Sequence, residues 1–307
     1  MKVIYGIGRL KLNKKSCLAV GVFDGLHRGH RSIIEKVVAI AKENKVSSVV
    51  LTFFPHPDSI IHSKNKSPLL ISLKHRLSLI ASLGVDICAV VKFNSYFSNM
   101  SAEDFVKEVL VKRFNIGYLV LNRNFTFGRD RFGDEKLVRK LSRCFNFKVY
   151  FQRDVKANGD IISSTLIRSL IKNGNLDKAC RLLGRRVEVI GTVVGGDRRG
   201  RRLGFPTANI DPHHEVIPPN GVYLIEAYLK DKRLFGLANI GLRPTFEKGK
   251  KETIEIHLLS FRRDIYNEDL RIVFLKKLRN EKKFKQRFNL VSQINKDIMQ
   301  ARRFFSI

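Results

Sequence analysis

The sequence has few features that would place it in a membrane or around a metal cluster. No window of about 18 apolar residues, the length that a membrane-spanning helix requires, occurs in its 307 residues. Its beginning, MKVIYGIGRLKLNKK, has no apolar stretch typical of a signal peptide. Four cysteines lie far apart and form no CxxC pair, which argues against a zinc site or a disulfide framework. We therefore expect a cytoplasmic protein without a membrane partner, whose thiols are buried or inert.

Acidic residues are also scarce. The chain has 28 Asp and Glu against 58 Lys and Arg, giving a formal net charge of +30. A basic surface attracts polyanions such as RNA, DNA, anionic lipids and nucleotides. However, the basic residues are spread over the whole chain, with the densest runs at 198–202 and 279–287, and no RNA-binding signature or zinc-finger spacing occurs. We therefore expect anionic small-molecule substrates and no specific nucleic-acid partner.

The first half of the chain alternates between two kinds of pattern. Short apolar segments rich in β-branched residues predict buried strands at 17–23, 46–53, 85–91 and 118–121. Helical patterns lie between them at 32–43, 73–83 and 102–111. This alternation predicts an α/β domain with a Rossmann-like parallel sheet, in which ligands bind beyond the C-terminal strand ends.

The second half has a different pattern. Strand-like segments separated by turns occupy 186–196, 221–229, 233–241, 253–261 and 270–278, and the next helical pattern begins only at about 281. Such a run predicts an antiparallel β-barrel or sandwich, here followed by a terminal helix over about 281–305. We therefore predict two domains, 1–183 and 184–307.

The first chemical motif is GVFDGLHRGH, residues 21–30, between the first predicted strand and the first helix. A helix N-terminus has unpaired N–H groups that bind anions. Gly25 and Gly29 let the backbone approach a ligand closely. His27 and His30, three residues apart, could donate hydrogen bonds to charge that develops on phosphate oxygens. The alternative is that each histidine is a capping or surface residue.

A second segment, ISSTLIRSLIKNGNL, has similar chemistry. Ser163, Ser164 and Thr165 stand at the start of a predicted helix, where a serine caps the first turn, and Arg168 follows one turn later. The alternative is an ordinary capped helix with a surface arginine.

These two motifs carry a family resemblance. G-x-F-D-G-x-H-x-G-H resembles the signature of the HxGH nucleotidylyltransferases, in the form found in their FAD synthetase branch, and S-S-T-x-I-R resembles their second nucleotide-binding motif. The resemblance implies that His27 and His30 are catalytic. It also implies that ATP is bound by Phe23, Gly25, His27, His30, Ser163, Ser164, Thr165 and Arg168. The HxGH motif alone leaves the acceptor phosphate open.

Two further segments point to a flavin. LTFFPHP, residues 51–57, is similar to the family's T-F-x-P-H-P, and NFTFGRDRFGD, residues 124–134, resembles the loop that receives FMN. This implies flavin contacts by Asn124, Phe125 and Phe127, although both phenylalanines could instead be core residues. The family commonly has Gly where this chain has Asn122; because Asn accepts positive φ, we expect the turn to form.

The second half has its own phosphate motif, GTVVGGDRRGRRLGFPTANI, residues 191–210. It is not a GxxxxGK[ST] P-loop. Its glycines could wrap around diphosphate oxygens. Thr207 and Asn209 point the same way in a strand, and their oxygens suit the Mg²⁺ carried by ATP. By composition alone, a flexible basic hairpin is the alternative.

G-F-P-T-A-N closely resembles the riboflavin kinase signature. PNGVYL (219–224), ANIGLRPTF (238–246) and TIEIHLL (253–259) follow in that family's order. The resemblance implies that Glu255 is the general base, although Glu255 could also be an exposed strand residue. Kinase ATP-binding residues are then Gly195, Gly196, Gly204, Thr207 and Asn209. Near the end, LRNEKKF resembles the family's R-x-E-x-x-F and implies flavin contacts by Arg279 and Glu281, unless these are only helix-start charges. Ser260 stands where the family usually has Asp.

From about Val20 to about Arg303 the chain thus resembles the bacterial bifunctional riboflavin kinase/FMN adenylyltransferase (FAD synthetase) family. The resemblance implies conversion of riboflavin to FMN and of FMN to FAD, with ATP as co-substrate and Mg²⁺ as cofactor. Two alternatives stay open: adenylylation or cytidylylation of another phosphate, and an inactive basic protein that binds nucleic acid or the ribosome. The sequence does not define the oligomeric state.

Overall fold

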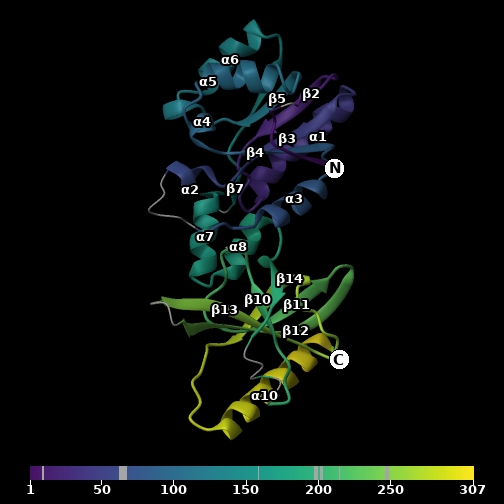
Figure 1. Cartoon of the computed structure of the whole chain (residues 1–307), viewed down its shortest axis with the longest axis vertical. Helices are drawn as coiled ribbons and strands as arrows, with labels where there is room; N and C mark the ends of the chain where they lie inside the picture. Colours follow the sequence, from purple (N-terminus) through teal and green to yellow (C-terminus); the bar gives the residue numbers. More distant parts are fainter. Residues whose placement is uncertain are drawn as a thin grey trace. The chain divides into compact units, whose positions relative to one another are not determined.

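A computed structural model describes residues 1–8, 10–61, 68–157, 159–196, 200, 203–213, 215–245 and 249–307. The chain forms two compact units (Figure 1). The first consists of Met1–Pro68 and Leu73–Ser164, and the second of Leu69–Ser72 and Thr165–Ile307. The predicted functional boundary between residues 183 and 184 stays a prediction. Within the described ranges, no helix has the length and apolar character needed to cross a bilayer.

The first unit contains a six-stranded parallel sheet, as the strand and helix alternation predicts. Its strand order is β1-β4-β3-β2-β5-β6. The strands are β1 (Lys2–Tyr5), β2 (Ser16–Val20), β3 (Ser47–Phe54), β4 (Ile87–Lys92), β5 (Ile116–Asn122) and β6 (Lys148–Gln152). From β2 the chain proceeds to β3 and β4 on one side and later to β5 and β6 on the other. The order in which the chain adds strands therefore reverses between β2 and β5. Ligands bind at such a switch point in open α/β sheets.

Helices connect these strands. They are α1 (Arg28–Glu43), α2 (Pro57–Ile61), α3 (Leu73–Ala81), α4 (Ser95–Ser98), α5 (Ala102–Asp104) with its π-helical continuation η1 (Phe105–Val111), the short 3₁₀ turn η2 (Arg129–Arg131) and α6 (Glu135–Cys144). Helix α1 packs on β2, β3 and β5. Its buried side chains recur at helical spacing: Ile33, Ile34, Val37, Ile40 and Ala41. A two-stranded ribbon, β7 (Lys156–Ala157) and β8 (Asp160–Ile161), precedes α7 (Ser164–Lys172).

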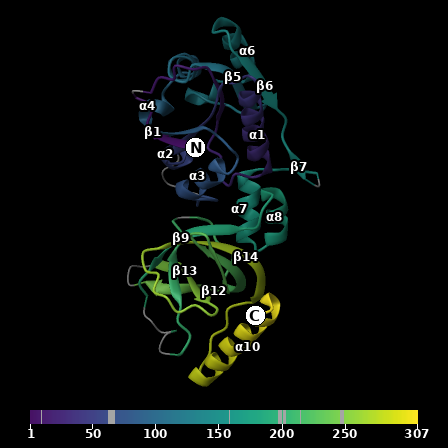
Figure 2. The same cartoon turned by 90° about the vertical axis from the view of Figure 1, so that its right-hand side faces the viewer.

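The second unit contains α8 (Leu176–Leu183) and a closed antiparallel barrel, which confirms the predicted architecture. The barrel order is β10-β13-β12-β11-β14-β9. Its strands are β9 (Glu188–Val194), β10 (Ala208–Asp211), β11 (Gly221–Leu229), β12 (Lys232–Thr245), β13 (Gly249–Leu258) and β14 (Asp269–Arg279). Helix α10 (Arg287–Phe305) lies along one side of the barrel (Figures 1 and 2). It is held there by apolar contacts such as Phe235 with Phe305, whose ring centroids are 4.4 Å apart.

The cysteines differ in environment. Cys17 and Cys88 are buried, and burial raises the pKa of each thiol to about 12, so both are inert as expected. Cys180 is half-buried, but Cys144 is exposed at the end of α6. Cys144 is therefore not one of the buried thiols, because this residue lies on the solvent side of an amphipathic helix, and that its thiol is inert stays a prediction.

Candidate active sites

The two histidines of the first motif stand together at the beginning of α1. His27 is the N-cap residue, and its Nδ1 accepts a hydrogen bond from the backbone N–H of His30 at 3.3 Å. The two rings stack, with centroids 3.6 Å apart and planes 18° from parallel. Because Nδ1 accepts, a neutral His27 carries its proton on Nε2. The helix therefore begins at Arg28, four residues before the predicted start, since a polar capping turn has no apolar periodicity.

His30 is held in a shielded position. The Phe23 ring meets it edge to face, with centroids 5.5 Å apart. His30 Nδ1 is buried without a hydrogen-bond partner. Burial, followed by the nearby His27 and Arg76, lowers the pKa of His30 well below 6.5. His30 is therefore a neutral imidazole at physiological pH.

The loop before α1 has an unusual backbone. Phe23 and Leu26 have positive φ angles of 53° and 37°, and Gly25 has a φ of 82°. A Cβ on Gly21 would lie 2.9 Å from the Phe23 ring. Positive φ is costly for residues with side chains and is often found at binding sites. The glycines at positions 21 and 25 of this motif thus have a steric reason.

A hydrogen bond connects the second motif to the first. The Ser164 hydroxyl donates to the backbone oxygen of Asp24 at 2.7 Å. Ser164 is the first residue of α7, Ser163 precedes it, and Thr165 and Arg168 lie within the helix. The structure thus joins Ser164 to the FDG loop. The ATP-binding roles assigned to this segment stay predictions.

Arg76, a residue that the sequence analysis did not identify, lies close enough to the histidine motif for its charge to act on His30. Its side chain in α3 is fully buried, and Nη1 donates to Thr52 Oγ1 and to Phe53 O, each at 3.1 Å. Thr52 in turn donates to Val22 O at 3.0 Å. Nε and Nη2 of Arg76 are buried without hydrogen-bond partners, and burial lowers the pKa of the guanidinium. This contact network explains the threonine of the LTFFPHP segment.

The predicted flavin loop follows β5. The Phe125 and Phe127 rings are nearly parallel, with centroids 5.8 Å apart, and both pack against the core while remaining partly exposed. The loop closes between Phe127 and Gly133, which exchange two backbone hydrogen bonds. Gly128 has a φ of 75°, and a Cβ there would lie 2.6 Å from the backbone N of Ala102. Core packing therefore accounts for the buried part of each phenylalanine ring, and the flavin contact stays a prediction.

Asn122 does not adopt the positive φ that we considered for the glycine position of the family. It is the last residue of β5, and its Oδ1 accepts the backbone N–H of Asn124 at 2.8 Å. The turn therefore forms through a side-chain hydrogen bond, as is common for Asn. A cavity of about 630 Å³ beside this turn is lined by Arg123, Asn124, Phe125, Thr126, Asp134, Glu135, Lys136 and Arg139.

In the second unit, strand register brings Glu255 between two asparagines. Glu255 on β13 is directly opposite Asn209 on β10 and opposite Asn239 on β12. Residues opposite one another in antiparallel strands share a face. Ile254 and Ile256 are each 1% exposed, whereas Glu255 is half-buried. Glu255 thus lies on the outer face of the barrel with two amides. Asn239 was not predicted as a site residue, because only the register places it there.

The predicted phosphate loop lies against Thr207 and Asn209. A Cβ on Gly196 would overlap the side chain of Asn209, 2.0 Å from Nδ2, and one on Gly200 would lie 3.0 Å from Thr207 Oγ1. Gly195 has open space, and Gly204 has a φ of 88°. Residues 197–199 and 201–202, most of the basic run, lie outside the described residues.

These residues fit a magnesium ion that is delivered with a nucleotide. In the described part of the chain, no three His, Cys, Asp or Glu residues are grouped as metal ligands. A hydroxyl and an amide oxygen beside a glycine loop leave most coordination positions to phosphate and water, as Mg²⁺ prefers. A cavity of about 390 Å³ adjoins Thr207 and is lined by Val193, Pro206, Thr207, Ala208, Ile256, Leu258 and residues 261–266.

The last two predicted flavin residues have structural partners. The Arg279 guanidinium binds the buried Asp297 carboxylate of α10 through Nε and Nη2, with distances of 2.7 to 3.1 Å. Glu281 Oε2 accepts from Asn220 Nδ2 at 3.5 Å. Arg279 therefore anchors the terminal helix, and its flavin contact stays a prediction. Ser260 is exposed, with a φ of 54°, in the turn after β13.

Together, a parallel sheet with a histidine pair at its switch point and a six-stranded barrel define a nucleotidyltransferase-like unit joined to a kinase-like barrel. The family model described as FAD synthetase matches residues 10–166, and the one described as riboflavin kinase matches residues 183–305. The chain belongs to the bifunctional riboflavin kinase/FMN adenylyltransferase family.

Relatives of that name match the whole chain. The protein of Buchnera aphidicola subsp. Schizaphis graminum is 35% identical over 100% of both chains. The Escherichia coli K12 protein is 36% identical over 100% of this chain and 99% of its own. A crystal structure described as a macrolide-efflux protein from Streptococcus pneumoniae is 28% identical, with a TM-score of 0.85 over 98% of this chain and 99% of its own.

Proposed function

We propose that this chain phosphorylates riboflavin to FMN in its barrel unit and adenylylates FMN to FAD in its parallel-sheet unit, with ATP as co-substrate of both reactions. The observation that carries this proposal is the His27–His30 pair, stacked at the start of α1 beyond the C-terminal end of β2. Together with the riboflavin kinase family match on the same chain, it favours FMN over another acceptor phosphate.

In the kinase reaction, the 5′-hydroxyl oxygen of riboflavin attacks the γ-phosphorus of ATP. The bond from that phosphorus to the β–γ bridging oxygen breaks, and ADP leaves. Glu255 takes the hydroxyl proton as general base. Thr207 and Asn209 would hold Mg²⁺, which offsets phosphate charge when it is bound with ATP. The backbone of the glycine loop that lies against these two residues would position the phosphates.

In the second reaction, an oxygen of the FMN phosphate attacks the α-phosphorus of ATP. The bond to the α–β bridging oxygen breaks, and pyrophosphate leaves. This second reaction needs no general base, because the attacking phosphate is already an anion. His27 and the neutral His30 donate hydrogen bonds to the charge that builds on the α-phosphate oxygens, and the N-terminus of α1 adds its partial positive charge. Ser164, whose hydroxyl donates to Asp24 O in the FDG loop, would bind the same triphosphate.

Incubation of the purified chain with riboflavin, ATP and Mg²⁺ tests both activities. Chromatography should show FMN first and FAD later, with pyrophosphate released only in the second phase. His30→Ala should accumulate FMN without forming FAD. Absence of both flavin products from the unaltered chain would reject the proposed function, and loss of both activities in a folded His30→Ala protein would reject the two-site division.

A further inference from the structure

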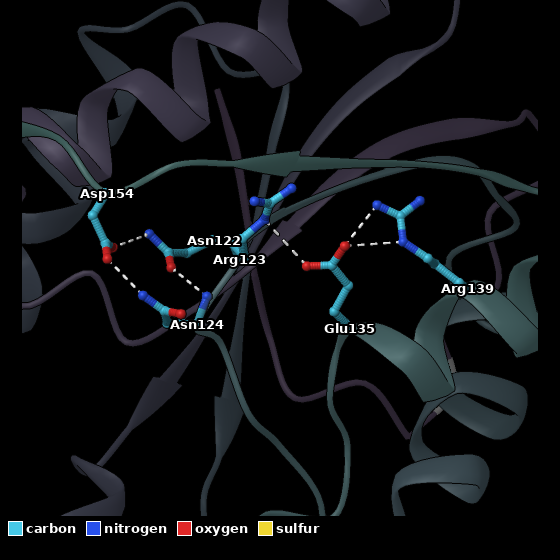
Figure 3. Close-up of polar contacts among 6 residues, drawn as sticks. All are labelled: Asn122, Arg123, Asn124, Glu135, Arg139 and Asp154. Carbon is cyan, nitrogen blue, oxygen red and sulfur yellow. Dashed lines mark hydrogen bonds and ion pairs between the residues drawn. The ribbon is translucent and has the colours of Figure 1, made fainter.

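Three polar residues at neighbouring strand ends form one closed hydrogen-bonded unit (Figure 3). Asn122 ends β5, and Asp154 follows β6 by two residues; the two strands pair in parallel. Asn122 Nδ2 donates to Asp154 Oδ1 at 2.9 Å, and Asn124 Nδ2 donates to Asp154 Oδ2 at 2.5 Å. Each carboxylate oxygen thus binds one amide. Asn122 Oδ1 accepts the backbone N–H of Asn124, which closes the unit.

Asp154 determines how both amides are oriented. An ionised carboxylate only accepts hydrogen bonds, so each amide must turn its NH₂ group toward Asp154. The Oδ1 atom of Asn124 consequently points away from Asp154, as Figure 3 shows. Asn124 is exposed and lines the cavity of about 630 Å³. What this residue presents to a ligand on that side is therefore a hydrogen-bond acceptor.

The backbone between the two asparagines is held on its other side as well. Arg123 Nε pairs with Glu135 Oε2 at 3.3 Å, and Arg139 binds Glu135 at 2.7 and 3.0 Å. The Arg123 backbone N–H also donates to Gln152 O at 2.8 Å. Several contacts thus fix the first residues of the loop before any ligand arrives, and such preorganisation lowers the entropy lost on binding. Among the described residues, the Asn124 amide hydrogen-bonds to Asp154 alone.

We propose that Asp154 is a positioning residue of the FMN site: through its hydrogen bonds to Asn122 and Asn124, it holds the Asn124 amide so that Oδ1 accepts a hydrogen bond from an N–H or O–H group of the flavin. This inference rests on the proposed function, in which the loop after β5 receives FMN. Without Asp154, the amide rotates, and half of its orientations place NH₂ against that donor.

Steady-state kinetics of adenylyl transfer test this role. Asp154→Ala should raise the KM for FMN about tenfold, the effect of losing one hydrogen bond to a ligand. The kcat at saturating FMN, the KM for ATP and the riboflavin kinase activity should each stay within about twofold, because the hydrogen bonds of Asp154 in the described residues go to Asn122 and Asn124, neither of which is assigned to ATP or to the kinase reaction. FMN fluorescence quenching should show the same weakening of binding.

An exchange of the two side chains provides a rescue. Asn124→Asp alone brings two carboxylates into contact and should raise the KM for FMN. In Asn124→Asp/Asp154→Asn, the amide at 154 donates to the carboxylate at 124, whose other oxygen remains an acceptor. This double variant should return the KM for FMN to within about threefold of the unaltered chain. Glu108→Gln, which removes an exposed carboxylate paired with Lys112, is the matched control and should change nothing.

The outcomes separate two failures. If the unaltered chain makes no FAD, the proposed function is wrong, and this inference falls with it. If it makes FAD but Asp154→Ala leaves the KM for FMN unchanged, only the role of Asp154 is wrong. If Asp154→Ala lowers the thermal midpoint and changes kcat and both KM values together, without rescue by the exchange, Asp154 has a structural role and the proposal is overturned.

Discussion

The ring of His27 lies parallel to the ring of His30, 3.6 Å away, while its Nδ1 caps the helix that carries His30. One side chain thus serves two purposes. It begins α1, and it lies beyond the C-terminal end of β2, where ligands of parallel sheets bind. Capping and catalysis can be separated by substitution, because Asn caps a helix well but has no imidazole.

His27→Asn should therefore separate the two roles. The new side chain keeps the cap, so the thermal midpoint should stay close to that of the unaltered chain. Adenylyl transfer should nevertheless fall about 10² to 10³-fold, as expected for loss of a donor to a developing charge. His27→Ala should lose the same activity and also about 1 kcal/mol of stability. Equal activity of His27→Asn and the unaltered chain would show that capping is the whole role of His27.

The pH dependence of the free energy of unfolding should reveal the lowered pKa of His30. Its pKa in the folded chain is lowered by burial, so below about pH 6.5 the unfolded chain binds a proton there that the folded chain does not. Its contribution to stability is therefore complete above that pH and is lost as the pH falls toward the folded pKa. As the pH falls, the free energy of unfolding measured with denaturant should decline more steeply for the unaltered chain than for His30→Asn. The difference in slope should be at most about 1.4 kcal/mol per pH unit. Parallel curves between pH 6.5 and 5 would contradict this.

We expect the buried charge of Arg76 to lower the free energy of unfolding. Its buried guanidinium has hydrogen bonds only at Nη1, and burial lowers its pKa although the nearby Asp24 carboxylate acts in the opposite direction, so burial of the charge is unfavourable. Arg76→Met should therefore unfold at the same or a higher denaturant concentration. Since Arg76 helps to lower the pKa of His30, that pKa should rise in the variant, as histidine NMR would show. A large loss of stability would mean that the Thr52 and Phe53 contacts outweigh burial of the charge.

Much of this fold could be predicted from the sequence because the buried strands are continuous apolar runs. Strands β1 and β6 were missed, since they lie at the sheet edges and have several exposed residues. The beginning of α10 was placed six residues early, at 281 instead of 287. Segments such as 281–286 are polar, so their state depends on tertiary contacts that local periodicity does not contain.

The site shows the same division. Residues within a motif, such as His27 and Glu255, were proposed from spacing and resemblance, and their roles stay predictions. Arg76, Asn239 and Asp154 were not, because each depends on a partner distant in sequence: on Thr52, on strand register with Glu255, or on the amides of the flavin loop. An arginine within an amphipathic helix pattern predicts a surface residue, and only the packed structure reveals its burial.

The Arg279–Asp297 contact should stabilise the second unit. Asp297 is 3% exposed and accepts from both Arg279 and Gln293. Arg279→Ala leaves a buried carboxylate with one partner and should lower the free energy of unfolding by about 3 kcal/mol. The double variant Arg279→Ala/Asp297→Ala should lose less than the sum of the single changes. Lys112→Ala, which breaks an exposed pair, should cost less than 1 kcal/mol. Additive losses would mean that the pair contributes no coupling.

Glu255→Gln tests the kinase chemistry. Glutamine fills the same space between Asn209 and Asn239 but cannot accept the proton of the riboflavin hydroxyl, so kcat for FMN formation should fall about 10² to 10⁴-fold. The KM values for riboflavin and ATP should change little, because shape and register are kept. Supplied FMN should still become FAD at the normal rate, since that reaction uses the other unit. Thr253→Ala, on the same face of β13, should retain kinase activity within about threefold. A kinase-active Glu255→Gln protein would remove Glu255 from the mechanism and leave the barrel without its assigned base.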